Sequence, residues 1–313
     1  MLNLKEVSIS YGDLEIVKCV SLSVNPGETV CLVGESGSGK TTILKGILGL
    51  LGENGRVTGG ELLFQGQKLA VLSPAEYRQL RGKQIAMIYQ QAGRSLDPVT
   101  KIGKQFHEML CTKGKCSRAQ SDERAAFYLS KLFLKEPKRI LKSYPSMLSG
   151  GTNQRVAIAM ALAMEPELIL ADEPTSALDV TVQVEVVKAL QQAKELSGAG
   201  ILMVTHNMGV VAHLADQVGV MYAGHLVEWG GTEQILQRPV HPYTRMLLDS
   251  VLGMDGTIPK LELCDAEKGK RKDGGCPYFS VCREKEAVCG ESAPVWTRIG
   301  ENHFILCREK ERL

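Results

Sequence analysis

The sequence predicts an α/β fold with a mainly parallel sheet, interrupted by helices and followed by a C-terminal extension. Short apolar runs typical of buried strands alternate with helix-forming segments in residues 1–90 and again after residue 168. Such alternation favours parallel strands joined by helices. Between these regions, residues 95–154 are charged and favour helices, and after residue 252 a charged, glycine-containing stretch precedes several cysteines.

Length and composition set bounds on the function. A chain of 313 residues can bury a large core, and a formal net charge of +2 gives no support to a nucleic-acid partner. No apolar run is long enough to span a bilayer. Residues 1–11 alternate between apolar and polar residues and include Lys5 and Glu6, which predicts a strand rather than a signal peptide. We therefore expect a chain that is soluble by itself.

A glycine-rich turn lies between strand-like residues 29–33 and the apolar, helix-like residues 41–51. Glycines there can adopt positive φ, so that successive backbone N–H groups point at a phosphate beside a helix N-terminus. We expect Lys40 to reach the β- and γ-phosphates of a nucleotide and the Thr41 hydroxyl to bind Mg²⁺. The alternative is an ordinary glycine-rich turn with a nearby lysine. Such a turn would not need to lie between a strand and a helix, as this one does. The predicted loop comprises Gly34, Glu35, Ser36, Gly37, Ser38, Gly39, Lys40, Thr41 and Thr42.

An acidic pair, Asp172 and Glu173, ends the apolar run of residues 168–171. A buried strand of this kind delivers carboxylates to the sheet edge where open α/β sheets bind ligands. One carboxylate, Asp172, can organise Mg²⁺ and its waters, and Glu173 can act as the general base that polarises the attacking water. The alternative is a polar strand end before the turn at Pro174.

A second anion site is predicted at Ser149, Gly150 and Gly151, which precede the helix-forming residues 152–163. They place a hydroxyl and free N–H groups at a helix N-terminus. Because one chain needs only one γ-phosphate site on its glycine-rich loop, the second is best explained if it completes the nucleotide site of another subunit.

In this order the motifs resemble the nucleotide-binding subunit of an ABC transporter, from residue 2 to about residue 252. The resemblance implies a P-loop NTPase with a RecA-like core, an antiparallel N-terminal β region and an inserted helical subdomain at about residues 95–154. It implies an ATPase domain over residues 1–252 and a C-terminal extension over residues 253–313. Its activity would be hydrolysis of ATP to ADP and phosphate.

The resemblance also implies roles for isolated residues. Tyr11 would stack on adenine, Gln90 would sense the γ-phosphate and share in Mg²⁺ binding, Asp179 would belong to the loop 176–179, and His206 would be the switch histidine. Taken singly, Tyr11 is as well explained as a strand aromatic and His206 as a core histidine. The catalytic set is therefore expected to be Glu173, His206, Gln90 and Lys40, with Thr41, Gln90 and Asp172 around Mg²⁺.

The nine cysteines fall into groups. We expect Cys19 and Cys31, in apolar strand-like sequence, to be buried thiols, and we assign no role to Cys111 and Cys116 in their polar loop. The remaining cluster lies in the last sixty residues: Cys276, Cys282, Cys289 and Cys307, separated by five, six and seventeen residues, with Cys264 upstream. In a cytosolic chain such a cluster is more often metal-binding or redox-active than disulfide-bonded.

Spacing alone does not identify a metal, because zinc and ferredoxin sites usually contain two-residue gaps. The segment 275–282, with the motifs 95–98 and 241–244, resembles ATPase subunits of oligopeptide, dipeptide and nickel importers, some of which hold a [4Fe-4S] cluster. Zinc and reduced structural thiols remain alternatives. Residues 148–155 resemble the signature motif of the family. Thr152 and Asn153 depart from the subfamily's usual residues after the glycines of this signature, as does Gln91 after Gln90, but no expected phosphate ligand is lost.

The resemblance implies a head-to-tail pair of ATPase domains enclosing two ATP molecules, commonly with a second, different ATPase chain. It further implies two transmembrane permease subunits, an extracytoplasmic substrate-binding protein, and a peripheral position on the cytoplasmic face of the plasma membrane. Peptides are the expected cargo, and nickel or another small solute the alternative. A soluble non-transport ABC-type ATPase is a rival of another class, although the chain has one motif set and no sustained heptads. A regulatory subunit with a decayed site is a further rival, but it would lack Glu173 or the signature.

Overall fold

The computed structural model describes residues 1–90, 95–176, 178, 180–252 and 274–307. The chain divides into two compact units. The first contains residues 1–2, 23–29 and 63–204, and the second contains residues 3–22, 30–62 and 205–313.

The first unit contains three parallel strands. β7 (Leu168–Asp172) lies between β6 (Ile85–Ile88) and β8 (Gly200–Val204), and α8 (Val180–Ser197) connects β7 to β8. Residues 168–171 and all of β8 are buried, the continuous apolar pattern of parallel strands covered on both faces. The predicted strand that ends in the acidic pair is confirmed.

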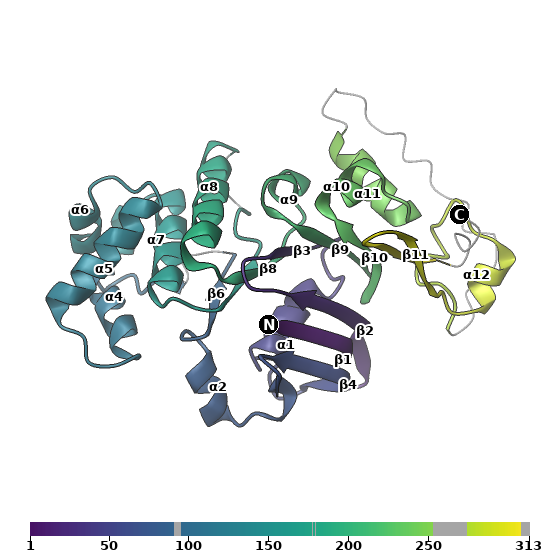
Figure 1. Cartoon of the computed structure of the whole chain (residues 1–313), viewed down its shortest axis with the longest axis horizontal. Coiled ribbons are helices and arrows are strands. Elements are labelled where there is room, and N and C mark those ends of the chain that lie inside the picture. The colour runs from purple at the N-terminus through teal and green to yellow at the C-terminus, as the bar shows by residue number, and fades with distance from the viewer. Residues whose placement is uncertain (91–94, 177, 179, 253–273, 308–313) are drawn as a thin grey trace. The chain divides into compact units, whose positions relative to one another are not determined.

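Helices fill the charged stretch between β6 and β7. α4 (Ile102–Cys111), α5 (Arg118–Lys131), α6 (Pro137–Lys142) and α7 (Gly150–Ala163) pack together, with α5 against the other three (Figure 1). The start of α5 is fixed by Ser117, whose side chain accepts the N–H of Gln120 in a reciprocal capping box. The shorter elements of this unit are β5 (Gln67–Lys68), α2 (Pro74–Leu80) and the 3₁₀ turns 69–71 and 145–147.

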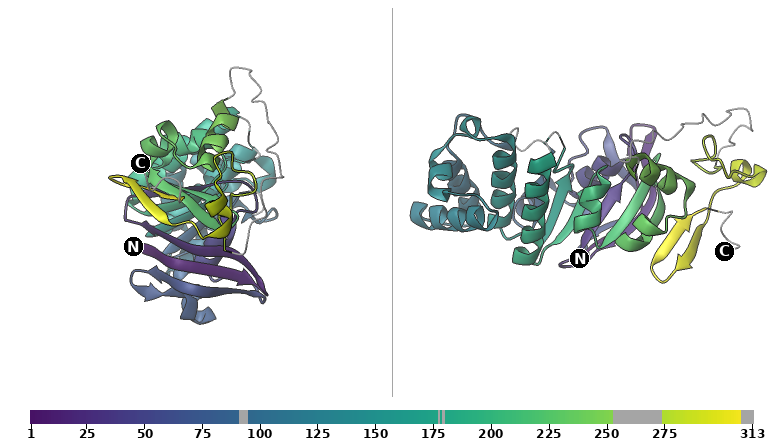
Figure 2. Two further views of the ribbon diagram at one scale, coloured as in Figure 1. Left: turned by 90° about the vertical axis from the view of Figure 1, so that its right-hand side faces the viewer. Right: turned by 90° about the horizontal axis from the view of Figure 1, so that it is seen from above.

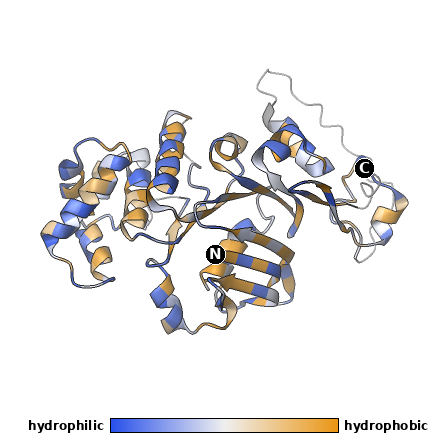
Figure 3. Cartoon of the chain, viewed as in Figure 1, coloured by the Kyte–Doolittle hydropathy of each residue, from blue (hydrophilic) through white to orange (hydrophobic). Residues whose placement is uncertain are grey.

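The second unit begins with an N-terminal sheet in which β1 (Leu2–Tyr11) lies between β2 (Leu14–Val24) and β4 (Gly55–Phe64). Hydrophobic and hydrophilic residues alternate along much of β1 and β2 (Figure 3), so that one face of these two strands is largely buried. Cys31, in β3, is buried as predicted, whereas the expectation for Cys19 is wrong, because Cys19 is exposed on β2 with a φ of 51°. The backbone of β2 is locally irregular at this residue, where the N–H of Cys19 donates to Ser8 Oγ (3.1 Å). The side chain of Cys19 therefore lies on the exposed face of the strand instead of the buried face.

The remaining strands of this unit form a mixed ladder. β3 (Thr29–Val33) pairs parallel with β9 (Gln217–Tyr222); β10 (His225–Gly231), β12 (His303–Leu306) and β11 (Trp296–Gly300) then follow antiparallel. Glu228 of β10 lies opposite Ile305 of β12, so C-terminal residues extend the same ladder (Figure 2). Helices α1 (Lys40–Ile47), α9 (Met208–Leu214), α10 (Thr232–Gln237), α11 (Pro242–Leu252) and α12 (Ala287–Glu291) complete the unit.

The first helix is shorter than the sequence predicts. It ends at Ile47 rather than near residue 51, because Gly49 adopts a φ of 60°. The N–H of Leu50 then bonds to the carbonyl of Lys45 (2.8 Å) and the N–H of Gly49 to that of Gly46 (3.1 Å). This pair of bonds is a Schellman motif, which terminates a helix even where apolar residues continue.

Among the described residues, no helix combines the length and apolar character needed to cross a lipid bilayer.

Candidate functional site

The glycine-rich turn has the backbone of a phosphate-binding loop. Gly34, Gly37 and Gly39 have φ values of 146°, 83° and 99°, as their predicted role requires. At Gly34 a side chain is also excluded, because a Cβ would lie 2.1 Å from the carbonyl oxygen of Met221. Gly39 is the N-cap of α1, so the loop leads directly into a helix N-terminus.

Lys40 points into this loop. Its side chain is buried, and Nζ donates to the carbonyl oxygens of Gly34 (2.8 Å) and Glu35 (2.7 Å) and to Ser38 Oγ (3.1 Å). A buried ammonium requires such acceptors, and phosphate oxygens would serve it equally well. Thr41 follows in the first turn of α1 and is half-buried. The loop therefore places one buried positive charge beside a helix N-terminus, an arrangement suited to binding phosphate.

The acidic pair lies at the end of β7, as predicted. Asp172 and Glu173 are half-buried, and the N–H of Glu173 donates to the carbonyl of Val204 (2.9 Å). Glu173 has a φ of 48°, a left-handed conformation that is uncommon for this residue type. Because such conformations persist where the surrounding structure imposes them, and cluster at active sites, this one marks Glu173 as a functional candidate.

Ser149 caps α7. Its Oγ accepts the N–H of Thr152 (3.2 Å) and lies 2.9 Å from Thr152 Oγ1, so the hydroxyl lies at the helix N-terminus as expected. Gly151 follows in the first turn and is buried against α8, where an added Cβ would lie 2.1 Å from Val182 Cγ1. At the second departure, Asn153 Nδ2 donates to the carbonyl of Pro145 (2.9 Å), whereas its buried Oδ1 has no hydrogen-bond partner among the described residues.

The isolated candidates occupy the ends of strands. Gln90 is exposed two residues after β6, Tyr11 is half-buried at the end of β1, and His206 is exposed just after β8. The alternative that His206 is a core histidine is thereby excluded. The N–H of the preceding residue, Thr205, bonds to the carbonyl of Leu32 in β3 (3.1 Å). Ala177, Asp179 and Gln91 lie outside the described residues.

The candidates divide between the two units. The second unit brings together the glycine-rich loop and the segment carrying His206, and also contains Tyr11; the first contains Gln90, Ser149, Asp172 and Glu173. Two further residues acquire a supporting role only in the structure. Gln154 bonds to the backbone after Glu173 within the first unit, and Tyr243 bonds to the backbone of Glu35 within the second. The segment 241–244, which contains Tyr243, is part of the family resemblance, but neither contact has a local sequence signal, because each partner is a backbone atom far away along the chain.

The C-terminal cysteines approach one another. The N–H of Cys276 donates to the carbonyl of Cys289 (2.8 Å). Burial raises the pKa of Cys282 to about 11, and the nearby Cys276 and Cys307 add to this effect. None of these four cysteines forms a disulfide within the described residues, and all four are partly exposed. Within the described ranges, however, no three His, Cys, Asp or Glu side chains are arranged to hold a metal ion, and Cys264 lies outside those ranges.

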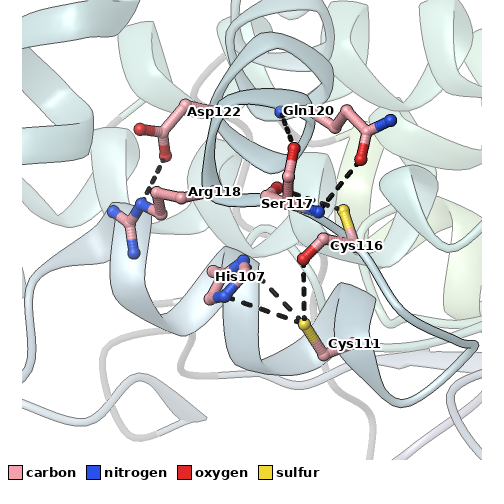
Figure 4. Close-up of polar contacts among 7 residues, drawn as sticks. All are labelled: His107, Cys111, Cys116, Ser117, Arg118, Gln120 and Asp122. Atoms are coloured by element: carbon pink, nitrogen blue, oxygen red, sulfur yellow. Dashed lines mark hydrogen bonds and ion pairs between the residues drawn. The ribbon is translucent and has the colours of Figure 1, made fainter.

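Cys111 and Cys116 flank the turn between α4 and α5 (Figure 4). Cys111 Sγ lies 3.8 Å and 3.9 Å from the ring nitrogens of His107, one helical turn earlier, and 3.7 Å from the carbonyl oxygen of Cys116. Cys116 Sγ lies 3.5 Å from the carbonyl of Ser117. These contacts are local to the turn and involve none of the candidate residues above.

A loop that cradles phosphate, a lysine inside it and a strand ending in paired carboxylates define a P-loop nucleotide hydrolase. Residues 17–176 match the family model described as ABC transporter, and residues 227–289 match the model described as oligopeptide/dipeptide transporter, C-terminal region. The chain therefore belongs to the ABC transporter family, and it is an ABC-type ATPase.

Known relatives match this chain over most of their own length. The chain is 41% identical to the oligopeptide transport ATP-binding protein OppD of Bacillus subtilis, over 97% of this chain and 87% of that protein. It is 36% identical to the dipeptide transport ATP-binding protein DppD of the same organism, over 98% and 94% respectively. A dimeric structure of the ATP-binding cassette MJ0796, in a post-hydrolysis state with ADP and Pi, superposes with a TM-score of 0.64 at 32% identity. That match covers 74% of this chain and 99% of that one.

Proposed function

We propose that this protein is the ATP-hydrolysing subunit that energises an ABC importer of di- or oligopeptides. The observation that carries the proposal is the phosphate-binding loop with Lys40 enclosed by its own carbonyls, in a chain whose relatives are named for oligopeptide and dipeptide transport. None of the relatives compared above is named for nickel, which makes nickel import the weaker alternative. A soluble ATPase without a transporter is disfavoured by the match of residues 227–289 to a transporter region.

Within this function, each candidate residue has a proposed role. The loop 34–42 binds the phosphates, Glu173 polarises the attacking water, and His206 and Gln90 contact the γ-phosphate side of the nucleotide. Tyr11 stacks on adenine, while Ser149, Gly150, Gly151 and Asp179 complete the site of a second ATPase subunit. Thr41, Gln90 and Asp172 supply the hydroxyl, amide and carboxylate oxygens that suit Mg²⁺, which neutralises phosphate charge when bound.

The proposed assembly pairs this chain with a second ABC ATPase subunit, and the support for a pair is that the solved ATP-binding cassette at 32% identity is dimeric. Two transmembrane permeases and an extracytoplasmic binding protein complete it, with this subunit peripheral on the cytoplasmic face of the plasma membrane. No nucleic acid takes part. We further propose the domain division of residues 1–252 and 253–313, with helices inserted at about residues 95–154.

For the C-terminal thiols we propose a [4Fe-4S] cluster on Cys276, Cys282, Cys289 and Cys307, with zinc as the alternative. The support is the donor chemistry, since four thiolates suit either metal and the described thiols share one neighbourhood. The described side chains would have to move closer to ligate a metal. Anaerobic purification followed by iron and sulfide analysis tests the cluster. Colourless protein with one zinc per chain, or with no metal, would reject it.

The function itself is tested by uptake in the source cells. Wild type and Glu173→Gln are compared for labelled short peptides and for nickel, with Glu195→Gln as an exposed carboxylate control. The proposal expects loss of peptide uptake only in Glu173→Gln. Loss of nickel uptake alone would favour the alternative cargo, and retention of both with normal expression would contradict a transport role in these pathways.

A further inference from the structure

A buried tyrosine ties the phosphate-binding loop to the C-terminal part of the second unit. Tyr243, in the first turn of α11, is fully buried, and its hydroxyl oxygen accepts the backbone N–H of Glu35 at 2.9 Å. The carbonyl oxygen of Glu35 accepts a hydrogen bond from Lys40 Nζ at 2.7 Å. Both backbone polar groups of Glu35 are therefore held, one by the loop's own lysine and one by a residue 208 positions later.

The position of Tyr243 is itself fixed by a buried polar network. Its N–H donates to His241 Nδ1 (3.1 Å), while the N–H groups of Val240 and His241 donate to the carboxylate of Glu228 (2.9 and 3.0 Å). Glu228, on β10, is fully buried and also meets His303 Nε2 of β12 at 2.7 Å. A satisfied network of this kind holds one arrangement, because each buried group left unpaired would cost free energy.

Aromatic packing continues from Tyr243 to the cysteine segment. The ring of Tyr278 lies 5.6 Å from that of Tyr243 and meets Tyr222 edge-on at 5.0 Å, while Tyr222 and Tyr243 are 4.8 Å apart. Tyr278 is buried, stands two residues after Cys276, and its carbonyl accepts the N–H of Cys282 (3.0 Å). The segment carrying the cysteines thus packs on the residue that holds the loop.

We propose that Tyr243 is a positioning residue for the phosphate-binding loop, and that the C-terminal cysteine segment sets the loop's nucleotide affinity through Tyr278. The inference rests on the proposed function, since it takes residues 34–42 to be the phosphate site. Because Tyr243 is fully buried and bonds to the backbone of Glu35, it acts through Glu35. With its hydroxyl in place, the loop has less freedom to lose when nucleotide binds, and preorganisation of that kind raises affinity.

Tyr243→Phe tests the first part, because it keeps the ring and removes only the acceptor. In the full chain we expect the dissociation constant for MgATP, measured by calorimetry, to rise about fivefold to tenfold, the usual effect of one hydrogen bond. Amide hydrogen exchange over residues 34–40 should become faster. Tyr144→Phe, at an exposed tyrosine, is the matched control and should change neither quantity. An unchanged dissociation constant together with unchanged exchange in Tyr243→Phe would overturn the assignment.

The pair Tyr278→Leu and Tyr278→Phe tests the second part. The aromatic contacts are lost in the first variant and kept in the second, so only Tyr278→Leu should weaken MgATP binding, by about threefold or more. Equal affinities in both variants and wild type would overturn the coupling. Failure of wild type itself to bind MgATP would instead reject the proposed function, and the exchange of residues 34–40 would still report whether Tyr243 holds Glu35.

Discussion

The side-chain nitrogen of Gln154 lies 2.8 Å from the carbonyl oxygen of Pro174, the residue that follows Glu173. The same Nε2 lies 3.4 Å from the carbonyl of Tyr89, next to Gln90. Gln154 projects from α7, five residues after the capping Ser149, and is buried. One amide in the first unit therefore joins the signature helix to the strand end with the acidic pair and to the residue beside Gln90.

The first prediction concerns this amide. Gln154→Leu keeps the volume but leaves two carbonyls without their donor, so we expect unfolding to become easier by about 1–3 kcal/mol. ATP turnover should fall further than that loss of stability explains, since the backbone around Glu173 is no longer held. Denaturant unfolding and steady-state ATPase assays measure the two effects. Gln192→Leu, at a half-buried position on α8, is the control, and equal behaviour of the two variants would contradict the prediction.

Glu173→Gln should abolish turnover while retaining ATP. The amide is isosteric but cannot accept the proton of the attacking water, and a general base commonly contributes a factor of about 10²–10⁴. We expect ATP to remain bound and the closed dimer to accumulate, which size-exclusion chromatography with MgATP would detect. The prediction fails if the variant hydrolyses ATP at the wild-type rate, and Glu195→Gln controls for loss of a negative charge.

Two glycines of the loop should differ sharply when replaced. Gly34→Ala places a Cβ 2.1 Å from a backbone carbonyl at a φ of 146°, whereas Gly37→Ala places one in open space at a φ of 83°. We expect the first to cost about 3 kcal/mol or more and the second only the local backbone strain, about 1–2 kcal/mol. Thermal unfolding of both variants beside wild type measures the difference. Similar melting temperatures for the two would show that the loop does not approach Met221.

Much of the nucleotide loop and the strand before it could be predicted from the sequence, because glycine spacing and apolar runs report local conformation directly. The end of α1 could not, since the run around Leu48 and Leu50 conceals a cap that depends on the left-handed backbone of Gly49. Cys19 was placed on the wrong side because a local break in β2 shifts the alternation.

Contacts between residues distant in sequence could not be predicted from the sequence either. Gln154 and Tyr243 act on backbone atoms of residues 20 and 208 positions away, and a backbone partner leaves no pattern of residue types. The pairing of β12 with β10 is similar, since two short strands 75 residues apart meet through Glu228 and His303. The candidate site residues could therefore be predicted from local sequence, whereas the distant residues that hold them in place could be identified only from the fold.

The last prediction concerns pH. Burial lowers the pKa of His241 to about 4; Glu228 and Glu284 oppose the shift, and Arg245 adds to it. Because this value lies below the ordinary 6.5, the unfolded chain takes up the proton first as the pH falls. The free energy of unfolding is therefore unaffected by this group above about pH 6.5, and it falls by about 3 kcal/mol as the pH decreases towards 4.

His241→Asn keeps an acceptor for the N–H of Tyr243 but does not titrate, so the unfolding free energy of this variant should depend less on pH between about pH 6.5 and 4. Denaturant unfolding at several pH values, with the exposed His213→Asn as control, measures the difference, and parallel pH profiles for wild type and His241→Asn would show that His241 takes up its proton equally in the folded and unfolded chains.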